Sequence, residues 1–301
     1  DGKIFKGLIA LCAISDYKAN KIKKHEEIRP SRLKFLVELF KTTKIMGEPT
    51  LLAHNGSVPL DVSAANQLYS FTTLDDKRHI VYQVSDDTQV AEIRAALGAI
   101  DSLYIADGHH RSASTEEFNA NVSALENDKS MCCIMHEEDL EILPFHRLIK
   151  PIVNFPKDEI IAALSVRFKV VNSDETLYEI KNRNEFGLYI DKQWYRLQLK
   201  EYSDLPDVQV LENYVVREIF NIADSRIDSQ INFHPHTSGE HMLKSLIDAE
   251  TYSLAITSKA CNFSEIRQVA DQDNTMPPKS TYIEPKLRAG LIIQEFGRIK
   301  K

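Results

Sequence analysis

The densest group of reactive side chains in this sequence is DGHHR at residues 107–111. An apolar run, LYIA, precedes it, and the pattern of the residues after it predicts a helix. Gly108 lets the backbone turn tightly and approach a ligand closely. The start of a helix leaves unpaired N–H groups and a partial positive charge, which suit an anion. The guanidinium of Arg111 matches phosphate oxygens, and His109 and His110 can donate hydrogen bonds or carry charge.

Asp107 ends the predicted strand, where it could hold a divalent cation or orient His109. Together these residues predict a phosphate-plus-metal site at the carboxyl end of a strand, where α/β sheets bind ligands. The alternative is structural, because Asp before a helix is a common N-cap and a histidine in a first turn is often only solvated. A structural zinc ion is disfavoured, since adjacent residues rarely ligate one ion together.

Two other segments carry side chains suited to phosphoryl chemistry. HEEIRPSR begins at His25, and Glu26 or Glu27 could act as a general base for an attacking hydroxyl. The simpler interpretation, favoured by the sequence alone, is an acidic helix N-terminus. MPPKSTYIEPK, residues 276–286, is either a surface loop or a segment that captures phosphate or carboxylate through Lys279, Ser280 and Thr281.

Two histidine-containing segments remain. LPFHRLIK at 143–150 sets His146 and Arg147 among apolar residues, and an arginine in such a frame usually has an anionic partner. INFHPHTSGEH at 231–241 has three histidines, and a polar loop is favoured there over a metal site. The sequence has no Walker A, GxGxxG or GxSxG motif.

The elements that must position these residues form a mixed α/β pattern, since residues 48–126 alternate strands with helices. From SMCCIM, at residues 130–135, a second α/β region of the pattern begins, and the domain boundary is expected near Lys150-Pro151. The predicted domains are a catalytic core at 1–150, a second lobe at 151–275 and a C-terminal segment at 276–301 that returns to the site. Strands are expected at 3–17 (one long or a bent pair), 48–54, 71–76, 79–84, 102–108, 130–135, 169–173, 185–191, 193–199 and 252–257. Helices are expected at 27–43, 61–70, 86–100, 109–127, 156–168, 207–220 (capped by Asp207), 239–250 and 261–274 (capped by Asn262 or Ser264).

The composition bounds the class of protein. The chain has 301 residues, is 43% hydrophobic and carries a net charge of −7. This acidic balance disfavours nucleic acid as a partner. Apolar runs fall short of the roughly 20 residues that a membrane helix needs, and no signal peptide is visible, so we expect a cytoplasmic protein without a membrane partner. The four cysteines show no CxxC spacing and are expected to be reduced core residues. The oligomeric state is left open.

The motifs also carry a family resemblance. YIADGHHRSAS resembles the signature of a family of bacterial and archaeal proteins long left without a function. That family is similar to the ParB/sulfiredoxin superfamily, in which a strand–turn–helix motif ending in Arg grips phosphates. Within the superfamily, the free L-serine kinases carry an HE pair, a helix, a strand and DGHHR in the order found here. LPFHRLI, DVQVLENYVVREIFNI and MPPKSTYIEPKLRAGLI extend the resemblance over most of the chain.

The resemblance implies a Mg²⁺-dependent phosphotransferase that makes O-phospho-L-serine from free L-serine. It favours pyrophosphate as donor, with ADP or ATP as the alternative, and a role in serine and cysteine metabolism. Glu26 matches the catalytic base, and Asp107 matches the acid at the metal and the serine hydroxyl. The remaining implied site residues are Gly108, His109, His110 and Arg111 for phosphate and His25, His146, Arg147, Lys279, Ser280 and Thr281 for substrate.

The chain departs from the pattern in two places. Relatives usually begin upstream of Asp1, and they often have Tyr or Trp where this chain has Ser112. Two other classes stay open. One is a ParB-like, nucleotide-switched DNA-binding protein, which the acidic charge disfavours. The other is a noncatalytic metal-binding protein that uses His109 and His110 or the 231–241 histidines.

Overall fold

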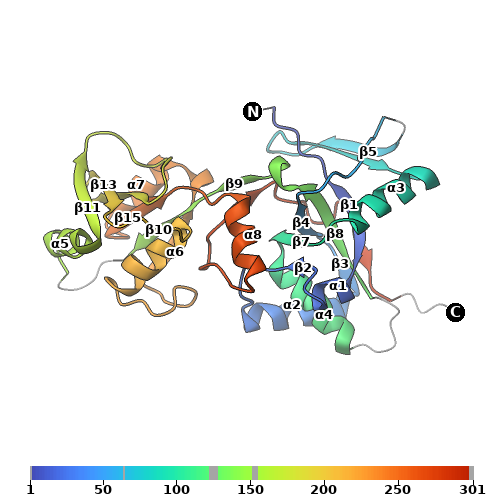
Figure 1. The fold of residues 1–301 in the computed structure, drawn as a ribbon, viewed down its shortest axis with the longest axis horizontal. Coiled ribbons are helices and arrows are strands. Elements are labelled where there is room, and N and C mark those ends of the chain that lie inside the picture. The colour runs from blue at the N-terminus through green and yellow to red at the C-terminus, as the bar shows by residue number, and fades with distance from the viewer. Residues whose placement is uncertain (1, 64, 122–127, 151–154, 298–301) are drawn as a thin grey trace. The chain divides into compact units, whose positions relative to one another are not determined.

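The computed structural model describes residues 2–63, 65–121, 128–150 and 155–297 (Figure 1). The chain forms two compact units. Unit 1 contains Asp1–Lys23, Pro30–Asp139 and Leu287–Lys301, and unit 2 contains Lys24–Arg29 and Leu140–Lys286. The predicted segments 1–150, 151–275 and 276–301 follow the chain consecutively, whereas each unit gathers segments that are distant in sequence. Within the described ranges, no helix is both long and apolar enough to cross a membrane.

Unit 1 is built on a five-stranded mixed sheet with the order β1-β8-β4-β7-β2. The central strand β4 pairs with β8 in parallel and with β7 in antiparallel orientation. All five residues of β4 are buried, as expected for an inner strand covered on both faces. The strands are β1 (Leu8–Ala13), β2 (Ile22–Lys23), β4 (Thr50–His54), β7 (Leu103–Asp107) and β8 (Lys129–His136).

Two helices of unit 1, α2 (Pro30–Thr43) and α4 (His109–Asn121), lie side by side (Figure 1). Phe40 of α2 and Phe118 of α4 pack edge to face, with 6.1 Å between their ring centres. Phe296, the residue after β17, joins them with its ring centre 5.0 Å from that of Phe118. This aromatic cluster holds the helix that begins at the DGHHR turn. The other elements are α1 (Ile14–Lys18), β3 (Ile45–Met46), β5 (Asn66–Thr72), β6 (Arg78–Gln83), α3 (Asp87–Gly98), the 3₁₀ turn η1 (Glu137–Asp139) and β17 (Gln294–Glu295).

Two element predictions in unit 1 are corrected. The strand expected over residues 3–17 spans only Leu8–Ala13, where the pairing with β8 ends with a bond from the Ile14 N–H to the Asp128 carbonyl, and the chain then turns into α1. The helix expected over 61–70 is replaced by β5. Its residues pair with β6 in a hairpin, where Tyr69 stands opposite Val81. Such cross-strand contacts override weak helical propensity. The part of the predicted helix 109–127 beyond Asn121 lies outside the described residues.

Unit 2 is built on a six-stranded antiparallel sheet with the order β11-β13-β12-β15-β10-β14. Alternate residues face two separate cores: Leu188 and Ile149 enter one, Tyr189 and Leu148 the other. The strands are β10 (Phe145–Ile149), β11 (Phe168–Ser173), β12 (Glu185–Ile190), β13 (Gln193–Leu199), β14 (Ile231–Pro235) and β15 (Leu254–Ser258), with β9 (Glu141–Leu143) and β16 (Tyr282–Glu284) forming a separate pair. The helices are α5 (Lys157–Arg167), α6 (Asp207–Leu211), the π-helix η2 (Glu212–Arg217), the 3₁₀ turn η3 (His236–Ser238), α7 (Glu240–Asp248) and α8 (Phe263–Asp271).

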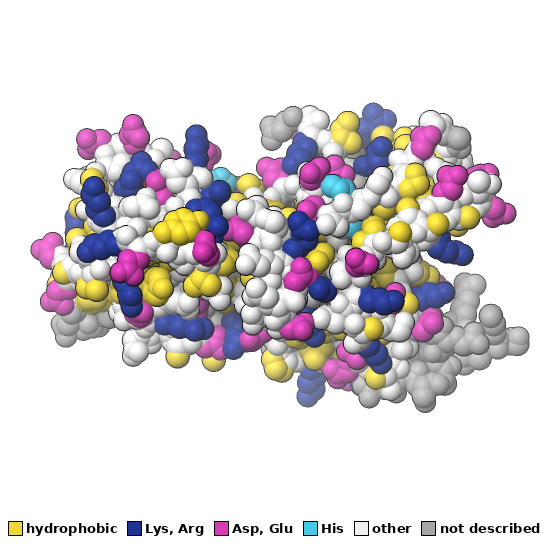
Figure 2. All heavy atoms as spheres, in the orientation of Figure 1, with side chains coloured by type: hydrophobic (Ala, Val, Ile, Leu, Met, Phe, Trp, Pro, Cys, Tyr) yellow, Lys and Arg dark blue, Asp and Glu magenta, His cyan; other side chains and the backbone are white. Residues whose placement is uncertain are grey.

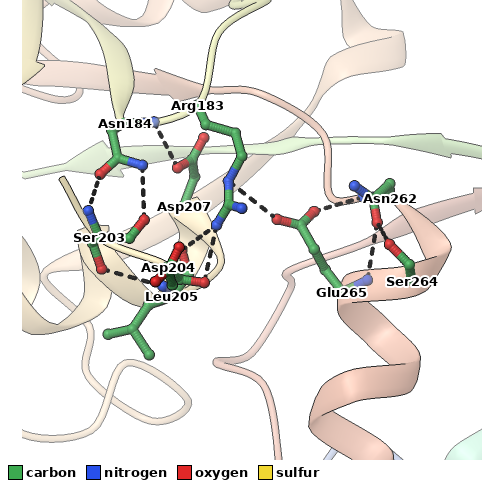
Figure 3. Close-up of polar contacts among 9 residues, drawn as sticks. All are labelled: Arg183, Asn184, Ser203, Asp204, Leu205, Asp207, Asn262, Ser264 and Glu265. Carbon is green, nitrogen blue, oxygen red and sulfur yellow. Dashed lines mark hydrogen bonds and ion pairs between the residues drawn. The ribbon is translucent and has the colours of Figure 1, made fainter.

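The helix predicted over 207–220 also differs from the structure. It is α-helical only to Leu211, and the Asp207 side chain does not cap it, because Pro206 occupies the cap position. Asp207 instead accepts a hydrogen bond from the Asn184 N–H at 2.9 Å (Figure 3). Burial raises the pKa of this carboxyl to about 6, although the Asn184 hydrogen bond opposes the shift. The predicted cap of α8 is confirmed, since Asn262 and Glu265 form a reciprocal capping box.

Surface charges of both signs are interspersed over the visible face of each unit (Figure 2). This mixing accompanies the net charge of −7. A face of mixed sign gives little of the sequence-independent attraction that phosphate backbones require.

Candidate functional site

The DGHHR segment forms a tight turn between β7 and α4 in unit 1. Asp107 is the last residue of β7 and is half-buried opposite Leu51 of β4. The Gly108 carbonyl accepts the first helical hydrogen bond, from the Ser112 N–H at 3.0 Å. Gly108 therefore occupies the N-cap position of α4, which the alternative interpretation of the sequence had assigned to Asp107. The Asp107 carboxyl stands at the carboxyl end of the strand, and Gly108 separates this residue from His109, the first residue of α4.

The backbone of Gly108 favours glycine at this turn, and a side chain there would displace Arg111. The Gly108 φ of +102° is a conformation that side chains strongly disfavour. A Cβ atom there would also lie 2.9 Å from both Nε and Nη2 of Arg111. The guanidinium thus lies directly over the glycine, and the turn and the arginine share one small space.

Arg111 is held along one side only. Its Nη1 forms an ion pair with Glu48 Oε1 at 2.8 Å, and the two side chains are 18% and 30% exposed. The buried Nε and Nη2 atoms have no hydrogen-bond partner among the described residues. These two N–H groups form the edge of the guanidinium that binds two phosphate or carboxylate oxygens at once. This unpaired edge of the guanidinium, here called the Arg111 fork, lies buried at the start of α4.

Two residues of this site were not predicted from the sequence. Glu48 holds Arg111, and Thr50 Oγ1 lies 3.1 Å from the hydroxyl of Ser112. Both precede or begin the EPTLLAH strand, which the sequence indicates only as an apolar element. The polar side chains of Glu48, just before β4, and of Thr50, its first residue, were the available signal.

The two histidines of the motif differ in environment. His109 is 3% exposed and belongs to the interior of unit 1, while His110 is half-buried. Of the two, His110 is therefore the more accessible to a ligand.

In unit 2, the segment that contains His25 and Glu26 adjoins the late loop. The Met276 N–H donates to the His25 carbonyl at 2.8 Å. Glu27 forms an ion pair with Arg226 and is fixed on its other side by Thr275. The neighbouring Glu26 is half-buried.

The late loop also contacts the LPFHR segment. Lys279 Nζ lies 5.1 Å from the centre of the Phe145 ring, and Tyr282 packs against the same ring at 5.6 Å. Ser280 donates to the Pro277 carbonyl at 2.6 Å, which closes the loop, and Thr281 is half-buried. Three segments singled out from the sequence therefore converge in unit 2.

His146 lies in a buried ring cluster. Its Nε2 is 3.1 Å from Nδ1 of His236, and Tyr178 donates to the His236 carbonyl at 2.6 Å. His234 stacks parallel to His146. Burial lowers the pKa of all three histidines, and for His146 their mutual proximity and Arg147 add to the effect. Among the residues described, no three His, Cys, Asp or Glu side chains are arranged to hold a metal ion.

Arg147 is fully enclosed in unit 2. It donates from Nη1 to the Phe145 carbonyl at 2.7 Å and stacks over Phe233. Burial lowers the pKa of its guanidinium to about 10, while the carboxylate of Glu212 opposes that shift. The described residues form no ion pair with Arg147, so the expected direct anionic partner is not present in them.

Comparison with known proteins establishes the family of the chain. Residues 1–223 match the family described as "Protein of unknown function (DUF1015)", and the chain belongs to this family. No curated protein matches it significantly.

Solved structures match nearly the whole chain. The structure described as "SbnI with C-terminal truncation from Staphylococcus aureus" matches with a TM-score of 0.51 at 13% identity, over 92% of this chain and 82% of that one. A conserved hypothetical protein from Pyrococcus furiosus matches with a TM-score of 0.47 at 14% identity, over 93% and 90%. A free serine kinase in complex with AMP matches with a TM-score of 0.46 at 15% identity, over 94% and 88%. The first of these supports the mixed α/β fold.

Proposed function

We propose that this chain is a phosphotransferase that transfers a phosphoryl group from pyrophosphate to the hydroxyl of free L-serine. The observation that carries the proposal is the Arg111 fork, anchored by Glu48 over Gly108 at the start of α4. A fork of this kind binds tetrahedral oxyanions, and a helix start adds favourable charge. The family description assigns no activity, so the identity of the reaction comes from the resemblance of HE…DGHHR…PKST to the free L-serine kinases and their ParB/sulfiredoxin-like relatives.

The proposed roles follow from the chemistry of each side chain. Arg111 and His110 hold phosphate oxygens, and Glu26 accepts the proton of the serine hydroxyl as its oxygen attacks phosphorus. Lys279 supplies a positive charge from the late loop for the phosphate or the serine carboxylate. Positioning and charge neutralisation then provide most of the rate enhancement.

A magnesium ion fits the residues present. Mg²⁺ is usually held by one or two carboxylates together with phosphate oxygens and waters. Asp107 offers one half-buried carboxylate at the strand end, four residues before Arg111 in the sequence. When bound, the ion would neutralise charge on the transferred phosphate.

The test is a phosphoryl-transfer assay with L-serine and Mg²⁺ in which pyrophosphate, ADP and ATP are offered separately and phosphoserine is detected. We expect product with pyrophosphate. The change Glu26→Gln should lower kcat at least about 100-fold, and Arg111→Ala should weaken donor binding. Glu27→Gln is the matched control for the base, because Glu27 is already paired with Arg226.

Each negative result has a distinct meaning. Product with a nucleotide alone would keep the site and reject the pyrophosphate donor. Full activity of the Glu26→Gln variant would reject the assigned base. Absence of phosphoserine with every donor would reject the serine kinase assignment for this chain.

A further inference from the structure

The short segment 44–48, which ends at Glu48, is held in unit 1 by the C-terminal part of the chain. Residues 288–296, here called the C-terminal strap, run beside this segment, and β17 of the strap pairs with β3. The Gly290 N–H also donates to the Gly47 carbonyl at 2.7 Å. Gly47 directly precedes Glu48, so the strap constrains the backbone next to the carboxylate that anchors the fork.

The side chain of Gln294 ties the strap to the main sheet of unit 1. Gln294 is 8% exposed and stands opposite Met46 in the β17–β3 pair. Its Oε1 accepts from the Met131 N–H at 2.7 Å, and its Nε2 donates to the Lys129 carbonyl at 2.9 Å. Both of these partners lie on β8, the strand that pairs with β4. One buried amide therefore joins the strap, and β3 with it, to the sheet.

The backbone pairing of the strap is short by comparison. The strands β3 and β17 have two residues each, and a ladder of this length contributes little stability by itself. The side chains that anchor the strap therefore set its position. At its start, Arg288 donates to Asp75 in the turn of the β5–β6 hairpin. At its end, the Phe296 ring packs against the rings of Phe40 and Phe118.

We propose that the C-terminal strap is a positioning element for the Arg111 fork and that Gln294 is its positioning residue. Gln294 holds the strap on β8, and the strap holds the backbone of Gly47. The next residue, Glu48, holds one side of the Arg111 guanidinium. Every contact in this series is a direct hydrogen bond or ion pair within unit 1. Gln294 thus acts on the fork through Glu48.

This role differs from a general contribution of Gln294 to stability in two respects. A residue that only stabilises the fold leaves Arg111 unchanged as long as the protein remains folded. A residue that acts through Glu48 alters Arg111, and this effect disappears once the Glu48 carboxylate is removed. The first respect needs no ligand, whereas any effect on pyrophosphate rests on the proposed function.

The first measurement is the rate at which phenylglyoxal modifies Arg111 in the ligand-free full chain, followed by peptide mass spectrometry. We expect this rate to be about three- to ten-fold higher in Gln294→Ala, because the guanidinium is then held less firmly by Glu48. The rate should also be high in Glu48→Ala, and adding Gln294→Ala to that variant should not raise it further. Arg167, an exposed arginine in unit 2, is the internal reference and should react at one rate throughout.

The second measurement is the dissociation constant of pyrophosphate in the presence of Mg²⁺, by calorimetry. Gln294→Ala should raise this constant about three- to ten-fold in the wild-type background and leave it unchanged in the Glu48→Ala background. Gln193→Ala is the matched control, because Gln193 also makes two hydrogen bonds, to the Ser173 and Trp194 carbonyls in unit 2. It should leave both measurements as in the wild type.

Modification of Arg111 at the wild-type rate in folded Gln294→Ala would overturn the proposal. So would an equal increase of that rate in the Glu48→Ala background. If the wild type does not bind pyrophosphate, the proposed function fails, and the modification rates still decide the role of the strap. Urea unfolding checks that each variant is folded. Gln294→Glu, which keeps an acceptor for the Met131 N–H, is the milder second variant and should lie between the wild type and Gln294→Ala.

Discussion

The position of the Arg111 guanidinium is set by two neighbours with opposite roles. Gly108 leaves the space that the guanidinium occupies, and Glu48 holds one of its nitrogens. A flexible arginine would lose side-chain entropy on binding an anion. Under the proposed function, much of that cost would be met before the anion arrives, because Glu48 already holds the guanidinium in place.

Glu48 is therefore predicted to be a positioning residue for anion binding. Removal of its carboxylate in Glu48→Ala frees the guanidinium to move away from Gly108. We expect the dissociation constant of pyrophosphate, measured by calorimetry with Mg²⁺, to rise about ten-fold. In the activity assay, KM for the donor should rise more than kcat falls, and Glu48→Gln should recover part of the loss by keeping a hydrogen bond.

The control for this prediction is Glu38→Ala, which removes an exposed carboxylate paired with Lys41 on α2. It should leave pyrophosphate binding unchanged. Tighter or unaltered binding by the Glu48→Ala variant would show that the ion pair does not orient the fork.

At the scale of elements, the ring cluster joins β10, β14 and η3 through His146, His234 and His236. The rings of His146 and His236 share a hydrogen bond. The positive charge of Arg147 lowers the pKa of His146, and the carboxylate of Glu179 acts in the opposite direction on the pKa of His236. The His146–His236 hydrogen bond needs one ring nitrogen without a proton. Protonation of both rings would replace an attraction with repulsion in a buried site.

Acid is thus predicted to destabilise the fold through this cluster. The folded-state pKa of each histidine is lowered, whereas the unfolded chain titrates near the usual pKa of about 6.5. The stabilising contribution is fully present above about pH 6.5 and is lost as pH falls toward the folded-state values. Each histidine contributes a slope of up to about 1.4 kcal/mol per pH unit in that window.

Urea unfolding between about pH 7.5 and pH 5 would measure this dependence. His146→Phe keeps an aromatic ring and should reduce the slope by up to about 1.4 kcal/mol per pH unit. His241→Asn, at an exposed position of α7, should leave the slope as in the wild type. An unchanged slope in His146→Phe would exclude His146 as the source.

The elements that could be predicted from the sequence are those marked by residues close to one another in the chain. The β7–Gly108–α4 junction and the Asn262 cap were predicted because an apolar run, a glycine or a capping residue marks each in the sequence. The 61–70 segment was misjudged because its state is set by pairing with β6. Glu48 was missed because its role arises only when β4 lies beside β7 and brings it to Arg111.

At the scale of the whole molecule, the units are assembled from segments distant in sequence. The last residues of the chain belong to unit 1, where β17 pairs with β3 and Gln294 bonds to the Met131 N–H. Contacts across such separations carry no local signature, so the sequence could indicate a returning C-terminal segment only through motif resemblance. The contribution of these contacts to the free energy of unfolding can be measured.

Phe296 is predicted to be essential to unit 1 although it lies near the end of the chain. It is 2% exposed, and its ring packs against Phe40 at 5.2 Å and against Phe118 on α4. Truncation in Phe296→Ala removes this burial and leaves a cavity, which should cost about 3–5 kcal/mol of unfolding free energy. Phe35→Ala makes the same chemical change on α2 at a ring that is 56% exposed, and it should cost under about 1 kcal/mol. Urea unfolding followed by circular dichroism compares the two. Equal losses in both variants would mean that the Phe296 ring does not stabilise the core that holds α4.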